Sequence, residues 1–347
     1  MASLTLPART IKTQPAARVS VADGGFPLAY NEGMAPKSRK AWLDRLVAVL
    51  VRLTVCVLQA LPVALANGFA ELLAKLAHRF DKRHRRVAAE NLGFAFPEKS
   101  PAEIDALVRR VYRHCALLLV EIALLPRKLQ VDNWRTYASL VRGDLILDGL
   151  LTDRPLLIVT AHFGNWEFAG FALGRLGFKT FAIARVLDNP HLEAFLKRFR
   201  QATGQTILAK KDDFERLSAV LQAGGKVATL GDQDAGPRGV FVEFLGRPAS
   251  AHKAVALMAL QFDAKMIVIG VPRIAENARR GLGRYEITCE DSIDPRDYGS
   301  QPDAVKAITQ RYHDALARLI RAHPEQYFWL HRRWKSQPAV RKKAANP

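Results

Sequence analysis

Cysteine is scarce in this chain of 347 residues, and the few cysteines that occur lie far apart. Cys56, Cys115 and Cys289 form no Cys-x-x-Cys pair. This spacing argues against a disulfide framework and against a structural zinc site, and it favours a reducing compartment. An apolar core stretch is also missing from the first 40 residues, so they do not resemble a secretory signal. We expect residues 1–40 to form a flexible extension.

Several common catalytic signatures are absent as well. The chain has no Gly-x-Ser-x-Gly element, no Walker loop and no Gly-x-Gly-x-x-Gly fingerprint. No serine or cysteine nucleophile is therefore indicated, and neither is a nucleotide-binding loop. Four residues could be imagined as metal ligands, but they come from separate segments without paired ligand spacing: His162, Asp232, Asp234 and His252. We expect no metal site, and a metal-dependent membrane hydrolase remains the alternative from another class.

Acidic residues are few relative to basic ones. The sequence has 52 Lys and Arg against 33 Asp and Glu, a net charge of +19. Such an excess points to a polyanionic partner, which could be nucleic acid, an anionic membrane or an acidic carrier protein. Aromatic residues are not interleaved with the basic ones, and no nucleic-acid-binding module is recognisable. We therefore do not expect nucleic acid as a partner.

Residues 41–99 are predicted to form a membrane-associated helical segment. The run from Trp42 to Leu61 is apolar around most of a helix, with one polar line through Arg45, Arg52 and Gln59. A helix of this kind is buried in protein or in lipid. With a charge inside and Pro62 at its end, it falls short of a clean span of about 20 apolar residues. We expect a helix in one leaflet or a short tilted anchor, followed by a basic block, Arg79–Arg86, that attracts anionic headgroups.

Residues 100–337 are predicted to form an α/β domain, and residues 338–347 a basic tail. Ser100, Pro101 and Glu103 mark a helix start, and we expect that helix to run to about Leu119. Strand-like and helix-like segments alternate afterwards, which favours a mostly parallel sheet flanked by helices. The expected strands are 156–160, 180–184, 206–209, 227–231, 266–271 and 285–289. The expected helices are 167–176, 192–203, 214–223, 251–262 and about 303–322.

Polar residues follow three of the predicted strands. His162 and Glu167 follow the first strand, Arg185 the second, and the run Asp232-Gln233-Asp234 the fourth. Because the carboxyl ends of parallel strands meet at one edge, these residues could share a cleft. A histidine oriented by a carboxylate can take a proton from a hydroxyl. Without an enzyme nucleophile, direct attack by a substrate hydroxyl is the simplest chemistry.

Five segments of the chain are distinctive when taken together and in order. They are Asn91-Leu92 with Phe96-Pro97-Glu98; His162-Phe163-Gly164-Asn165-Trp166-Glu167; Arg185 with Leu187-Asp188-Asn189-Pro190; Asp232-Gln233-Asp234 followed by Gly239–Phe244; and Trp329-Leu330-His331-Arg332-Arg333-Trp334-Lys335. With these segments, the chain from about Trp42 to Lys335 resembles the lipid A biosynthesis acyltransferase family, the late lauroyl or myristoyl transferases, and related phosphatidylinositol mannoside acyltransferases. Val186 stands where the family has Pro.

The resemblance implies a monotopic enzyme on the cytoplasmic face of a bacterial inner membrane, with a glycerol-phosphate-acyltransferase-like fold. Such an enzyme moves a fatty acyl chain from acyl carrier protein, or from CoA, to a glycolipid hydroxyl and needs no other cofactor. The acceptor could be a lipid A precursor or a phosphatidylinositol mannoside-like lipid.

The resemblance also assigns roles to particular residues. His162 would be the base and Glu167 would accept a hydrogen bond from its ring. Arg185 would bind the oxyanion or a phosphate. The remaining candidates for substrate binding are Asn165, Asn189, Asp232, Gln233, Asp234, Arg332, Arg333 and Lys335, with the last three expected at lipid phosphates.

Overall fold

A mostly parallel sheet lies at the centre of the computed structural model, which describes residues 41–209, 213–276, 282–299 and 301–338. The predicted extension 1–40, and the predicted tail beyond residue 338, lie outside these residues. The strands are β1 (Ala138–Val141), β2 (Leu156–Thr160), β3 (Thr180–Ala184), β4 (Thr206–Ala209), β5 (Lys226–Leu230), β8 (Lys265–Gly270), β9 (Arg273–Ala275) and β10 (Arg284–Ile293).

Within the described residues the strand order is β1-β10-β8-β2-β5-β3-β4, with β9 paired to β10. The five strands from β8 to β4 are parallel, whereas β10 runs antiparallel to β8. The prediction of a mostly parallel α/β fold is therefore confirmed. The expected strand at residues 285–289 is longer than predicted and runs in the opposite direction to β8, between β8 and β1.

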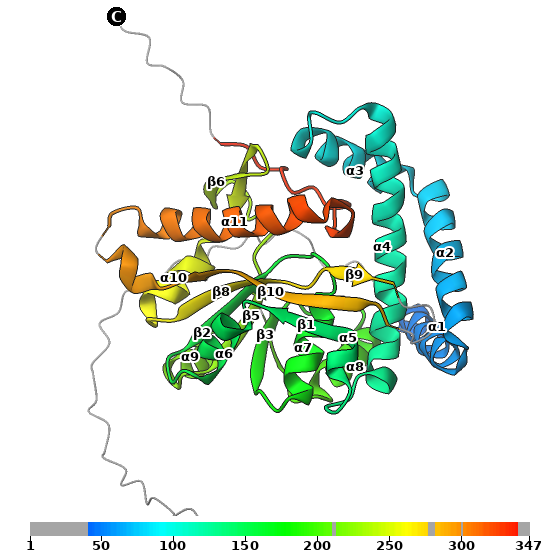
Figure 1. The fold of residues 1–347 in the computed structure, drawn as a ribbon, viewed down its shortest axis with the longest axis horizontal. Helices are drawn as coiled ribbons and strands as arrows, with labels where there is room; N and C mark the ends of the chain where they lie inside the picture. The colour runs from blue at the N-terminus through cyan, green and yellow to red at the C-terminus, as the bar shows by residue number, and fades with distance from the viewer. Residues whose placement is uncertain (1–40, 210–212, 277–281, 300, 339–347) are drawn as a thin grey trace, which may run out of the picture. The chain divides into compact units, whose positions relative to one another are not determined.

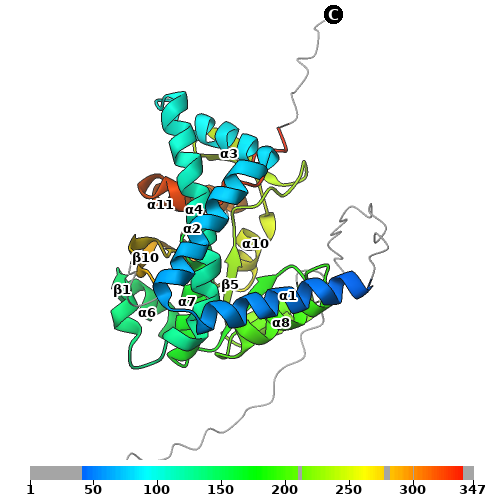
Figure 2. The same ribbon diagram turned by 90° about the vertical axis from the view of Figure 1, so that its right-hand side faces the viewer.

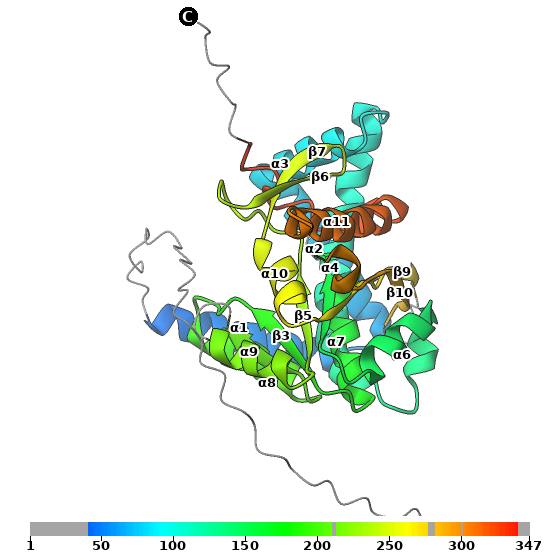
Figure 3. The same ribbon diagram turned by 90° about the vertical axis from the view of Figure 1, so that its left-hand side faces the viewer.

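Helices cover both faces of this sheet (Figure 1, Figure 3). They are α6 (Gly143–Leu151), α7 (Trp166–Arg175), α8 (Pro190–Gln201), α9 (Phe214–Gln222), α10 (Lys253–Gln261) and α11 (Ala304–Ala322). Strand β2 shows how the layers form: Leu157 and Val159 belong to the core beneath α10 and α11, whereas Leu156 and Ile158 belong to the core beneath α6 and α7. A strand buried on both faces reads as a continuous apolar run, and for this reason β2 was predictable.

Five helices of the described residues precede the first strand: α1 (Ala41–Ala60), α2 (Val63–Phe80), α3 (Lys82–Ala95), α4 (Pro101–Lys128) and the short α5 (Trp134–Tyr137). The predicted start of α4 is confirmed, because Ser100 and Glu103 form a capping box. Its predicted end near Leu119 is wrong. The helix continues through a buried apolar stretch to Lys128, with Pro126 in its last turn. Proline is tolerated there because burial of the preceding residues offsets one missing hydrogen bond.

Several elements have no counterpart in the sequence prediction. They include β1, α5, α6, β9 and the two strands of an antiparallel hairpin, β6 (Val240–Phe244) and β7 (Arg247–Ala251). The hairpin packs against α11. Short strands with mixed polarity carry little periodic signal, so they were not separable from loops.

Helix α1 lies beside α8 (Figure 2), and two residues of its polar line contact neighbouring helices. The Arg52 guanidinium lies 5.8 Å from the centre of the Phe195 ring of α8, and Gln59 donates a hydrogen bond to the Ala123 carbonyl of α4. Most of the apolar circumference is left exposed. This is the reverse of an ordinary amphipathic surface helix, which buries its apolar side.

The exposed apolar side chains of α1 and α2, which we call the apolar patch, are Trp42, Leu43, Leu46, Val47, Val49, Leu50, Leu53, Val57, Leu65, Phe69, Leu72, Leu76 and Phe80. Large exposed apolar surfaces mark sites of membrane or protein interaction. Among the described residues, no helix has the length and hydropathy to cross a membrane.

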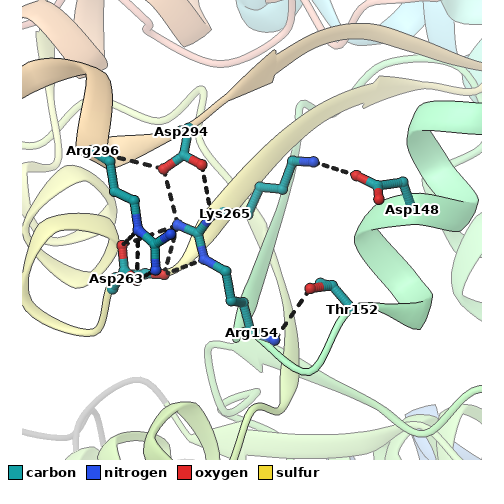
Figure 4. A network of polar contacts seen from close by, with 7 residues as sticks. All are labelled: Asp148, Thr152, Arg154, Asp263, Lys265, Asp294 and Arg296. Carbon is teal, nitrogen blue, oxygen red and sulfur yellow. Dashed lines mark hydrogen bonds and ion pairs between the residues drawn. The ribbon is translucent and has the colours of Figure 1, made fainter.

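An ion-pair network lies at the N-terminal ends of strands β2 and β8 (Figure 4). Arg154, just before β2, bonds to Asp263 and to Asp294, and Arg296 bonds to Asp263. Lys265, at the start of β8, pairs with Asp148 of α6. These contacts join the starts of β2 and β8 to the segment after β10 and to α6, so their role is structural.

Candidate active site

The loop that joins β2 to α7 has a tightly fixed backbone. The Gly164 N–H donates to the Gln326 carbonyl, the Asn165 N–H to the Val271 carbonyl, and the Phe328 N–H to the His162 carbonyl. Gly164 has φ +59°, and a Cβ at this position would lie 2.0 Å from the Val271 oxygen. Only glycine fits here, because both the backbone angle and the close approach exclude a side chain.

His162 and Asp232 meet at the ends of two adjacent parallel strands. Strands β2 and β5 pair up to Thr160 and Leu230, and each candidate lies two residues farther along its chain. The His162 Nδ1 lies 2.9 Å from one Asp232 oxygen, and the His162 backbone N–H donates to the other at 3.1 Å. Because an ionised carboxylate only accepts, Nδ1 carries the proton and Nε2 presents its lone pair.

The environment of this pair raises the pKa of His162 and lowers the pKa of Asp232. Asp232 is fully buried, whereas 18% of the His162 side chain is exposed. Burial lowers the pKa of His162, but the charge and hydrogen bond of Asp232, together with the charge of Glu167, raise it above its ordinary value. Burial raises the pKa of Asp232, yet the interaction with His162 holds it well below its usual range. Asp232 is thus a carboxylate at neutral pH.

The expected hydrogen bond from His162 to Glu167 is replaced by the one to Asp232. Glu167 lies in the first turn of α7 and accepts hydrogen bonds from Arg200 of α8 with both carboxylate oxygens. Its charge still acts on His162. Residue Arg200, which the sequence prediction missed, could have been suspected only from the periodicity of α8, since nothing in its local motif is distinctive.

Aromatic rings surround the His162 side chain. The ring of Trp166 lies edge-on with its centre 5.2 Å away, and the centres of Phe328 and His331 lie at 6.1 and 6.4 Å. Nε2 has no hydrogen-bond partner among the residues that the structure describes. His331 was part of a recognised sequence segment but was not predicted as a site residue. Its Nδ1 lies 2.7 Å from the Phe328 carbonyl.

The three basic residues of the C-terminal segment occupy different environments. Arg332 and Lys335 are exposed, as lipid-phosphate ligands would need to be. Arg333 is fully buried, so its expected contact with a lipid phosphate is wrong. Its guanidinium donates to the Ser250 carbonyl at 2.7 Å, lies 3.1 Å from His313 Nε2 and stacks over the Phe244 ring. Arg333 therefore joins the chain end to the hairpin and to α11.

Both predicted asparagines are buried helix caps, in place of the substrate contacts expected of them. The Asn165 side chain accepts from the Phe168 N–H and donates to the Tyr285 hydroxyl. The Asn189 side chain caps α8 and donates to the Asp44 carbonyl of α1. Their amide groups are thus used to hold α7 and α8 in place.

The remaining candidates lie at the loops of the same sheet edge. Asp234 accepts from the Ser336 hydroxyl at 3.0 Å and so holds the C-terminal segment. Gln233 is exposed, and Arg185 is exposed beside Asp188 at 3.3 Å. Within the described part of the chain, no three His, Cys, Asp or Glu residues are grouped closely enough to hold a metal ion.

Fold and site together define an α/β protein with a carboxylate-oriented histidine at the carboxyl ends of two parallel strands. The comparison with known families agrees. Residues 36–336 match the family described as bacterial lipid A biosynthesis acyltransferase, so the chain belongs to this family and is an acyltransferase.

Curated relatives are distant but span most of the chain. The lipid A biosynthesis lauroyltransferase of Escherichia coli (strain K12) is 26% identical over 271 residues, which are 77% of this chain and 84% of the relative. The myristoyltransferase of the same strain is 22% identical over 301 residues, 85% of this chain and 86% of the relative. The phosphatidylinositol mannoside acyltransferase of Mycobacterium tuberculosis (strain ATCC 25618 / H37Rv) is 27% identical over 183 residues, 51% of this chain and 54% of the relative.

Proposed function

We propose that the protein transfers a fatty acyl chain from a thioester to a hydroxyl group of a membrane glycolipid, with His162 as the general base. The observation that carries this proposal is the 2.9 Å contact between His162 Nδ1 and the buried Asp232 carboxylate. This contact fixes the tautomer whose Nε2 can accept a proton, and it stabilises the imidazolium that forms.

The reaction needs no covalent enzyme intermediate. Nε2 of His162 takes the proton of the acceptor hydroxyl while its oxygen attacks the thioester carbonyl carbon. The tetrahedral intermediate then collapses, the carbon–sulfur bond breaks, and the imidazolium returns the proton to the leaving thiolate. The products are an ester and a free thiol, and no further cofactor is required. General-base assistance of this kind contributes roughly 10²–10⁴-fold.

Glu167 and Arg185 have supporting roles in this proposal. The Glu167 charge adds to that of Asp232 in favouring the protonated form of His162, while Arg200 holds the carboxylate in place. Arg185 is exposed at the end of β3, where it can meet the oxyanion or a substrate phosphate. A donor at the oxyanion is commonly worth about 3–4 kcal/mol.

Charge and the named relatives support the proposed donor and acceptor. We propose acyl carrier protein as the donor, because an acidic carrier complements a chain of net charge +19, with CoA as the alternative thioester. A lipid A precursor is the proposed acceptor, with exposed Arg332 and Lys335 at its phosphates. The mannoside acyltransferase relative favours a phosphatidylinositol mannoside-like acceptor as the second candidate.

The apolar patch supports membrane attachment. We propose that the exposed side of α1 and α2 rests in the cytoplasmic leaflet of the bacterial inner membrane as a monotopic anchor. Burial of such side chains stabilises binding by about 25 cal/mol per Å² of apolar surface. An enzyme anchored in this way would meet an acceptor lipid of the same leaflet.

The test is acyl transfer by the purified full-length protein, with acyl carrier protein as donor, a phosphoglycolipid acceptor and a chelator in the buffer. His162→Ala should lose at least about 100-fold in kcat. The control is His191→Ala, at a histidine of α8 that takes no part in the proposed chemistry. Near-wild-type transfer by His162→Ala, or transfer to water alone, would refute the proposal.

A further inference from the structure

A groove away from His162 separates α3 from the start of α4. It has a volume of about 540 Å³. The residues that line it are Lys82, Arg85, Arg86, Ala89, Gly93, Lys99, Pro101, Ile104, Asp105 and Val108. Nothing in the acyl-transfer proposal uses this groove, although four of its ten lining residues are cationic.

The rim of the groove carries unbalanced positive charge. Its one acidic residue, Asp105, is already paired with Arg109 at 2.6 Å. Arg85 donates to the His78 carbonyl. Lys82 and Arg86 are exposed and have no hydrogen-bond or ion-pair partner in the part of the chain that the structure describes. Cations clustered without counter-charges favour an anionic ligand.

The floor of the groove is apolar, in contrast to its rim. Ile104 and Val108 are buried beneath it, and Ala89 and Pro101 line its sides. Gly93 leaves space, because a Cβ added there would meet no atom within 4 Å. A cationic rim above an apolar floor suits an amphiphile with an anionic head better than a fully hydrated anion.

The groove begins where the apolar patch ends. Phe80, the last residue of α2, is 73% exposed and lies two positions before Lys82. Helix α3 also reaches the active site, because Asn91 on it donates to the carbonyls of Trp329 and His331. A lipid bound in the groove would thus hold α3 at the membrane surface beside the segment that contacts His162.

We propose that this groove binds the phosphate headgroup of an anionic bilayer lipid, with the adjoining apolar part of the lipid on its floor. Lys82 and Arg86 supply the free cations for the phosphate, and Arg85 and Lys99 complete the rim. The inference rests on the proposed membrane attachment and makes it selective for anionic lipid.

The experiment measures binding of the full-length protein to phosphatidylcholine vesicles with and without phosphatidylglycerol. The test variant is K82Q/R86Q. The control, R83Q/R110Q, removes the same charge from exposed residues of α3 and α4 that do not line the groove. Since one cation at an anionic surface is worth about 1 kcal/mol, or about fivefold, K82Q/R86Q should bind the anionic vesicles about 25-fold more weakly. The control should lose less than about fivefold, because diffuse attraction is screened by salt.

A second variant tests the groove without removing a cation. G93E adds a carboxylate to the open space and should weaken anionic vesicle binding as K82Q/R86Q does, with thermal unfolding as the check on folding.

Equal losses in K82Q/R86Q and its control would show diffuse attraction and overturn the proposal. Intact vesicle binding with a raised KM for acyl carrier protein would also overturn it, because the occupant would then be the acidic carrier. Free phosphate at millimolar concentration should not compete with anionic vesicles for the protein. Competition would show that the apolar floor takes no part in binding and would overturn the proposal of a lipid ligand. Transfer to a detergent-solubilised acceptor should persist in K82Q/R86Q, so failure of this inference would leave the catalytic proposal standing.

Discussion

Replacing Asp232 by Asn keeps the shape of the buried side chain and removes its charge. In the native protein, the carboxylate accepts from both the backbone N–H and Nδ1 of His162. The neutral amide can still accept one hydrogen bond, but it no longer stabilises the imidazolium. It can also donate to Nδ1, which would put the proton on Nε2 and abolish the base.

The size of the effect follows from the lost hydrogen bond. A hydrogen bond to a charged group contributes about 1.5–3 kcal/mol, which corresponds to roughly 1–2 pH units in the pKa of His162. Asp232 raises that pKa and burial lowers it, so the variant's histidine should titrate below its ordinary value. A His162 ring that carries its proton on Nε2 cannot act as the base, which lowers activity further. We therefore expect kcat to fall by about 10²–10⁴-fold.

The assay is the pH dependence of kcat/KM for acyl transfer by Asp232→Asn and by the wild type. The neutral form of His162 is the base, so activity rises with pH through its pKa. In the variant this rise should move to lower pH by about 1–2 units while the plateau drops. A plateau within about threefold of the wild type, or an unmoved acidic limb, would refute the assignment of Asp232 as the residue that positions His162.

Three further predictions concern the structure around the site. Gly164→Ala should lose most soluble or active protein, because its Cβ would meet the Val271 carbonyl; expression and circular dichroism check this. Arg333→Met should lower the free energy of unfolding, measured in urea, by about 2–4 kcal/mol, because the buried groups that accept hydrogen bonds from the guanidinium would lose their donor. Arg154→Ala should lower the midpoint of thermal unfolding with unchanged KM. Its hydrogen bond lowers the pKa of Asp294 to about 2, so this stabilisation is present above about pH 4 and lost as the pH falls toward 2; the variant should therefore lose less stability over that range.

The sequence predicted those parts of the fold in which a local pattern and the tertiary environment agree. Strand β2 is apolar on both faces, and helix α4 begins with a complete capping box, so all of β2 and the start of α4 were found at the correct residues. The antiparallel direction of β10 was not predictable, because periodicity reports burial and not direction. The hairpin of β6 and β7 was missed for a similar reason, since its strands are only partly buried.

At the site, the sequence identified the residues better than their contacts. His162 and Asp232 were both candidates, but their hydrogen bond depends on β2 and β5 being neighbours, which no local motif encodes. Glu167 appeared to be the partner because it is close in sequence, yet its position in the first turn of α7 directs it to Arg200. Arg333 resembled its exposed neighbours in composition, and only the packed chain end shows that it is buried.

The hydrogen bonds that complete the loop around His162 come from residues near the end of the described chain. Gln326 and Phe328 bond to this loop, and Ser336 bonds to Asp234. During synthesis at about 5–20 residues per second, the first half of the site would wait on the order of 10 s for its second half. A ribosome that stops before Gln326 therefore releases a chain with most of its sheet and no finished active site, so translation of residues 326–336 decides when the enzyme becomes competent.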